Sequence, residues 1–154
     1  MIVVENSIEL KMLIKQRIEE QGHNCDLNDI DVSRVKDMSY LFYDSKFNGD
    51  ISQWDVSKVR DMSFMFSNSK FNGDISTWDV SKVEDMRYMF TGSLFKGDIS
   101  KWNVSSVESM YSMFRDSRFD GDISKWDVSR VRDMEDMFYK SPLDGNEPGW
   151  YEAN

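Results

Sequence analysis

The sequence is short of several residue types that chemistry often depends on. Its 154 residues include one cysteine, one histidine and two prolines. The lone Cys25 excludes an intramolecular disulfide framework and a metal cluster built from cysteines. Basic residues are outnumbered 19 to 28 by acidic ones, giving a formal net charge of −9. This balance argues against direct binding of nucleic acid or an anionic membrane, and it favours a basic partner or simply solubility.

Long apolar segments are also missing. The opening residues, MIVVENSIELKMLIKQ, lack the basic and then apolar regions of a signal peptide, and Glu5 and Glu9 interrupt them. No run is long enough to cross a bilayer, so we expect no membrane insertion. The sequence as it stands predicts a cytoplasmic protein, and a surface or secreted one if an export signal has been removed.

The chain repeats itself for most of its length. FNGDISQWDVSKVRDMSFMF, residues 47–66, returns from Phe71 as FNGDISTWDVSKVEDMRYMF and from Phe119 as FDGDISKWDVSRVRDMEDMF. Residues 24 positions apart form columns of one residue type: Trp54, Trp78, Trp102, Trp126 and Trp150; Gly49, Gly73, Gly97, Gly121 and Gly145; Phe42, Phe66, Phe90, Phe114 and Phe138. Such a period is typical of a solenoid, whose units bury their apolar faces against each other.

Each unit combines two hydrophobic periods, which predicts an α/β solenoid. Val59, Met62 and Phe66 are spaced as on one face of a helix, with Ser57 as a possible N-cap. The GDIS segment predicts a brief strand that pairs in parallel with its copies. Ser7 to Gln21 has the pattern of an amphipathic helix that caps the first unit. We therefore expect six helices and about five short strands in a single repeat domain. Its parts would be a helical N-terminal cap (1–24), repeats (25–141) and a C-terminal cap (142–154).

The repeated motif also suggests a family. Its DISxWDVSxVxxMxxMF pattern, from about Cys25 to Trp150, resembles the repeats of BspA-like bacterial leucine-rich-repeat surface proteins. This resemblance implies a right-handed solenoid of 24-residue strand-turn-helix units, similar to leucine-rich-repeat proteins. Members of that family are commonly exported proteins implicated in adhesion or host contact.

One acidic column is the first candidate for a binding site. It consists of Asp26, Asp50, Asp74, Asp98 and Asp122. If the neighbouring Ile51 points inward, these carboxylates point outward from strands about 4.8 Å apart and attract cations or a basic surface. The alternative is that each aspartate shapes a turn by accepting hydrogen bonds from nearby backbone or serine groups. Calcium is disfavoured, because each unit has one glycine where calcium-binding nonapeptide coils have several.

Other columns suggest packing, and some suggest recognition. We interpret the tryptophan and methionine columns as core, and we interpret Asp31, Asp55, Asp79, Asn103 and Asp127 as structural capping residues. The positions where the copies differ are more informative, because packing does not select them. Those beside the predicted strand, Gln53, Thr77, Lys101 and Lys125, are candidates for partner contacts.

These observations favour a non-catalytic protein–protein interaction module that binds a basic partner through an acidic face. The alternatives are a small acidic inhibitor, such as an immunity protein or nucleic-acid mimic acting on a nuclease or other nucleic-acid-binding enzyme, and a fragment of a bacterial surface adhesin. The sequence has no nucleophile–base constellation, glycine-rich phosphate loop or paired histidines, so we expect no enzymatic activity, cofactor or metal. We expect a monomer.

Overall fold

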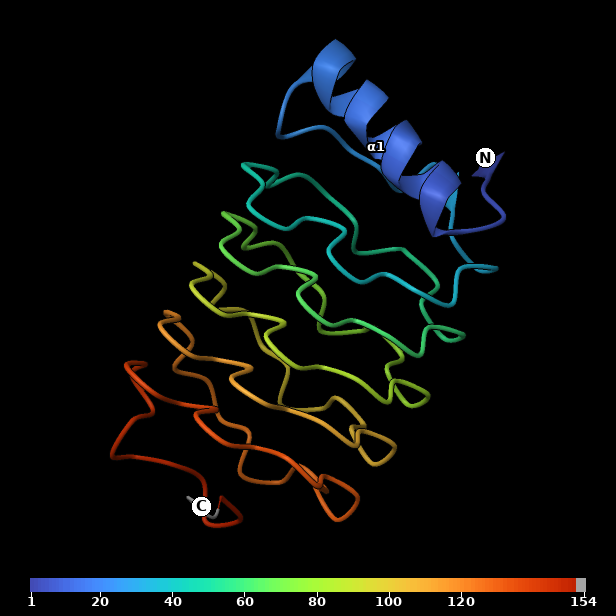
Figure 1. Cartoon of the computed structure of the whole chain (residues 1–154). Coiled ribbons are helices and arrows are strands. Elements are labelled where there is room, and N and C mark those ends of the chain that lie inside the picture. Colours follow the sequence, from blue (N-terminus) through green and yellow to red (C-terminus); the bar gives the residue numbers. More distant parts are fainter. Residues whose placement is uncertain (152–154) are drawn as a thin grey trace.

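An N-terminal helix lies across one end of a stack of chain coils, and the chain runs from this end of the stack toward the other (Figure 1). The computed structural model describes residues 1–151. These contain β1 (Ile2–Val3), α1 (Ser7–Gln21) and β2 (Ile30–Asp31). Strands β1 and β2 pair in parallel, with Ile2 opposite Ile30. No helix in this part of the chain has the length and apolar character needed to cross a bilayer.

Helix α1 has the bounds expected from its amphipathic pattern, and this prediction is confirmed. It begins after Asn6, whose side chain accepts a hydrogen bond from the N–H of Glu9 at 3.0 Å. It ends at Gly22, whose φ of 87° suits a residue without Cβ. Leu10 and Ile14 are buried against the first coil. The helix thereby covers the apolar end of the stack.

The repeats contain no helix between residues 25 and 151, so the expectation of a helix in each unit is wrong. The chain instead runs through successive reverse turns. Each is closed by an N–H bonded to the carbonyl three residues earlier: Trp54 to Ile51, Val59 to Val56, Met65 to Met62, Ser67 to Phe64, and Ser69 to Phe66. Phe64 (φ 58°) and Asn68 (φ 53°) adopt left-handed conformations that an α-helix does not accommodate. Ser57 therefore caps no helix.

Neighbouring coils are joined through the segment that was expected to be helical. In one coil the donors are the N–H groups of Met62, Phe64, Phe66 and Asn68, and in the next the acceptors are the carbonyls of Asp85, Arg87, Met89 and Thr91, at 2.8–3.0 Å. The equivalent bonds recur between the other coils, and all run in the same direction along the stack. Parallel bridges accompany them: Asp37 with Asp61, Asp61 with Asp85, Asp85 with Ser109, and Ser109 with Asp133.

The GDIS segments contribute less pairing than expected. Among residues 1–151 they form one parallel bridge, Asp26 with Asp50, so the predicted ladder of five strands is wrong. In the later coils, side-chain oxygens accept backbone N–H groups that would otherwise bond to carbonyls of a neighbouring strand. The N–H of Asn72 donates to Asn48 Oδ1 in the preceding coil at 2.8 Å, and the N–H of Ser76 donates to the carboxylate of Asp74. A segment whose N–H groups are used in this way cannot extend a regular ladder.

The core is a set of stacked aromatic columns, flanked by methionines. The rings of Phe42, Phe66, Phe90 and Phe114 follow one another at 5.6 Å, and those of Phe47, Phe71, Phe95 and Phe119 at 6.3 Å. Each tryptophan indole N–H donates to a carbonyl of the preceding coil, as Trp78 does to Ile51 at 3.2 Å. The tryptophans of the central coils are buried, and so are most of the methionines in both columns. The interpretation of these columns as core is confirmed.

Candidate functional site

The predicted acidic column lies on the surface, one carboxylate per coil. All five of its aspartates are exposed, and we call this set the acidic ladder: Asp26, Asp50, Asp74, Asp98 and Asp122. Each Oδ1 accepts the backbone N–H of the residue two positions later at 2.8–2.9 Å. These bonds form turns in which the aspartate closes its own loop. The turn-forming interpretation is therefore confirmed, and the carboxylates are also exposed to solvent.

Local hydrogen bonds favour the ionised form of four carboxylates of the ladder, Asp50, Asp74, Asp98 and Asp122. The backbone N–H and hydroxyl of Ser76 lower the pKa of Asp74, although the charges of Asp50 and Asp98 act in the opposite direction. Equivalent serine bonds lower the pKa of Asp50, Asp98 and Asp122. These four carboxylates thus carry negative charge at neutral pH.

The variable positions beside the ladder change its charge from one end to the other. Gln53 and Thr77 are neutral and exposed, whereas Lys101 and Lys125 are exposed cations. Their charges lower the pKa of Asp98 and Asp122 respectively. In the coils nearer α1, an open groove of about 500 Å³ runs beside the ladder. It is lined by Asn24, Asn48, Gly49, Asp50, Ser52, Gly73 and Asp74. The negative charge is therefore least offset in the coils nearer α1.

The second acidic column also serves turns. Asp31, Asp55, Asp79, Asn103 and Asp127 each accept the N–H of a serine two positions later at 3.0–3.1 Å. The hydroxyl and N–H of Ser81 lower the pKa of Asp79. The residues cap reverse turns rather than helices, so the predicted capping chemistry is present in a different structural context. Asn103 shows that an amide at such a position keeps the same bond.

Sequence reasoning missed a third column of the same kind. Asp37, Asp61, Asp85 and Asp133 accept the N–H two residues later through Oδ1, and Ser109 does so through its hydroxyl. Burial raises the pKa of Asp85, and the charge of Asp61 adds to this effect. The available signal is the Asp-Met pair that recurs in four units, within the segment whose spacing predicts a helix.

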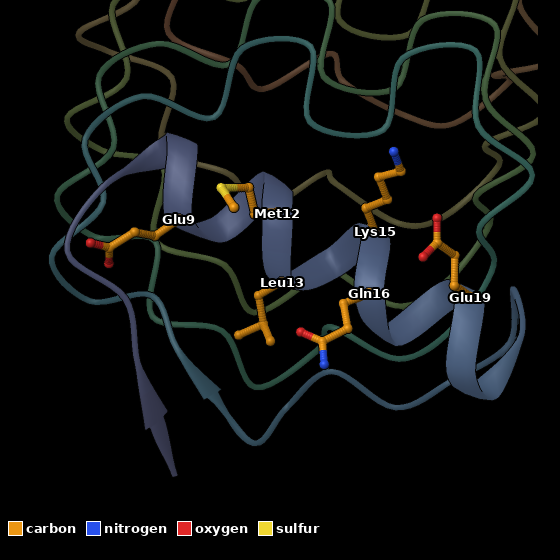
Figure 2. A pocket seen from close by; sticks show the side chains of 6 residues that line it. All are labelled: Glu9, Met12, Leu13, Lys15, Gln16 and Glu19. Atoms are coloured by element: carbon orange, nitrogen blue, oxygen red, sulfur yellow. The ribbon is translucent and has the colours of Figure 1, made fainter.

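A further groove lies along α1 at the capped end. Figure 2 shows its six lining residues, which all belong to the helix: Glu9, Met12, Leu13, Lys15, Gln16 and Glu19. Its volume is about 590 Å³, and Met12 is exposed within it. Acidic, basic and apolar groups alternate along the groove, so it presents no single recognisable chemistry. Across residues 1–151, no three histidine, cysteine, aspartate or glutamate side chains are grouped to hold a metal ion.

Comparison with known proteins identifies the family. Two overlapping stretches, residues 11–94 and 71–150, match the family described as "Mycoplasma protein of unknown function, DUF285". Because the two matches together cover most of the chain, the protein belongs to this family of bacterial repeat proteins. No curated protein and no solved structure matches it.

Proposed function

We propose that the protein is a non-catalytic protein–protein interaction module that binds a basic protein through the acidic ladder. The stack would act as a solenoid of the type that the BspA-like leucine-rich-repeat resemblance implies. Its units, however, consist of turns where that family pattern predicted helices. A rigid, repetitive surface of this kind suits recognition of an extended partner.

The observation that carries the proposal is that each coil exposes one ladder carboxylate, held in place by a bond to a backbone N–H two residues later. Each carboxylate is held by a bond to its own backbone, so its position costs little additional side-chain entropy on binding. One carboxylate is exposed in each coil, and serine bonds favour the charged form of Asp50, Asp74 and Asp98, so consecutive coils present a negative field. A basic partner would be steered by that field, and the charge would mainly set the association rate and specificity.

The test is an affinity capture from a lysate of the source organism with the wild type and two matched triple variants. One variant carries Asp50→Asn, Asp74→Asn and Asp98→Asn. The other carries the same charge change on the second column, at Asp55, Asp79 and Asp127. Asparagine preserves the turn bond in both, as Asn103 shows. We expect a basic protein to be retained by the wild type and the second-column variant and lost by the ladder variant. Equal retention by all three would contradict the proposed site.

A further inference from the structure

Two consecutive coils contain an asparagine that is followed directly by a glycine. The pairs are Asn48-Gly49 and Asn72-Gly73, and both asparagine side chains are exposed. In such a dipeptide the backbone nitrogen of the glycine can attack the side-chain amide of the asparagine, because glycine has no Cβ to hinder a close approach. The two pairs are therefore candidates for a modification that the chain carries out on itself.

The fold does not require asparagine at this position. In the next two coils the same place is taken by Lys96 and Asp120, and a glycine follows each of them. The carboxylate of Asp120 is exposed and lies 4.0 Å from the ammonium of Lys96. The coil therefore forms with an amide, an amine or a carboxylate at this position, and a change from amide to carboxylate is compatible with the stack.

The side-chain carbonyl of each asparagine accepts a backbone N–H from the following coil. Asn72 donates its N–H to Asn48 Oδ1 at 2.8 Å, and Lys96 donates its N–H to Asn72 Oδ1 at 2.8 Å. A donor at this oxygen stabilises the negative charge that develops there when Cγ is attacked. The stacking of the coils thus supplies one oxyanion-stabilising hydrogen bond to each pair.

The attacking nitrogen and its surroundings are accessible. Neither Gly49 nor Gly73 donates its N–H to a backbone carbonyl within residues 1–151. The open groove of about 500 Å³ beside the ladder is lined by Asn48 and by both glycines. Water can therefore reach the reacting groups, and ammonia can leave them.

We propose that Asn48 and Asn72 are sites of self-modification, at which asparagine becomes aspartate or isoaspartate. The nitrogen of the following glycine forms a bond to Cγ, and the bond between Cγ and Nδ2 breaks. The proton of the glycine N–H leaves with Nδ2 as ammonia, and a succinimide ring remains. Water then opens the ring. Its addition at Cγ gives aspartate, and its addition at the main-chain carbonyl gives isoaspartate.

Each event adds one negative charge to the surface that carries the acidic ladder. Asn48 lies two residues before Asp50, and Asn72 lies two residues before Asp74. The added charge therefore falls in the coils nearer α1, where the negative charge of the ladder is least offset. The modification needs only water, so it does not depend on the proposed function or on a partner.

The test is a time course on the folded full chain at neutral and mildly alkaline pH. Peptide mapping by mass spectrometry and chromatography distinguishes asparagine, aspartate and isoaspartate at each site. Two internal controls lack the glycine. Asn24 is exposed in the same column and precedes Cys25, and Asn28 precedes Asp29 although its Oδ1 also accepts a backbone N–H from the next coil, at 2.9 Å. The variant Lys96→Asn places a further asparagine before a glycine in this column. The chain unfolded in denaturant is followed in parallel.

We expect Asn48 and Asn72 to be lost in the folded chain while Asn24 and Asn28 persist. The loss should be faster at alkaline pH, because the attacking nitrogen must give up its proton. The asparagine introduced by Lys96→Asn should be lost as well. Conversion in the unfolded chain alone would overturn the inference, because the fold would then protect the two pairs. Equal conversion of the two controls, or none at the introduced asparagine, would also overturn it, since the glycine and the position in the coil would not be the cause.

Discussion

Replacing Gly73 with alanine tests whether the glycine column exists to admit the phenylalanine rings. A Cβ added at Gly73 would lie 2.8 Å from Cε2 and 2.9 Å from Cζ of Phe71. Ordinary carbon contacts are about 3.5–4.0 Å, so the ring would have to move by nearly 1 Å. It has little room to do so. Its centroid lies 4.6 Å from that of Phe66 and 6.3 Å from those of Phe47 and Phe95.

Two opposing effects set the magnitude of this change. Overpacking a core costs about 1–3 kcal/mol. Alanine also reduces the freedom of the unfolded chain, which stabilises the fold by about 0.4–1 kcal/mol where the backbone conformation permits it. Gly73 lies outside the left-handed region, so that gain applies here. We expect a net loss of about 0.5–2 kcal/mol, or a melting temperature lower by about 2–8 °C.

Chemical denaturation of four variants measures the effect and its cause. Gly149→Ala is the control, because nothing lies within 4 Å of its added Cβ, and it should be neutral or slightly stabilising. Phe71→Leu combined with Gly73→Ala should cost less than the two single changes together, since the smaller side chain leaves space for the methyl group. If Gly73→Ala behaves like Gly149→Ala, or if the double variant shows no coupling, the explanation of the glycine column is refuted.

Four further predictions concern stability. Phe90→Ala should lower the free energy of unfolding by about 3–5 kcal/mol in urea titration, because Phe90 is fully buried between Phe66 and Phe114; a loss below that range would show that the stack collapses around the cavity. Trp78→Phe should cost about 1–3 kcal/mol, because the carbonyl of Ile51 loses the indole N–H; an unchanged unfolding midpoint would contradict this. Asp85→Asn should raise the melting temperature slightly at neutral pH, because burial disfavours the charged carboxylate; a decrease would show that its ion pair with Arg87 outweighs burial. Stability should decline as the pH falls below about 4. The folded-state pKa values of the serine-bonded aspartates lie below their unfolded values. The stability that these aspartates contribute is therefore complete above their unfolded-state pKa and is lost as the pH falls through their folded-state pKa. A melting temperature that does not change in acid would contradict this prediction.

Much of the packing could be predicted from the sequence. The 24-residue period identified the inward columns of tryptophan, phenylalanine and methionine, because a side chain that meets its own copy in every coil is constrained to one type. Helix α1 was predicted to the residue from its apolar spacing, which is a local feature; its capping residue Asn6 is also local. The exposed position of the acidic ladder also followed from the pattern around Ile51.

The path of the backbone between those columns was decided only by the tertiary structure. Val59, Met62 and Phe66 have helical spacing, but reverse turns closed over three residues bring the same side chains inward. The hydrogen bonds between coils favour these turns over a helix. They join residues such as Phe66 and Met89, which are distant in sequence and meet only when the coils stack. For the same reason the sequence did not reveal that Tyr40, Phe64 and Tyr88 form one surface. Local spacing thus determined which side chains are buried, while contacts between coils determined the backbone conformation and the surface that it presents.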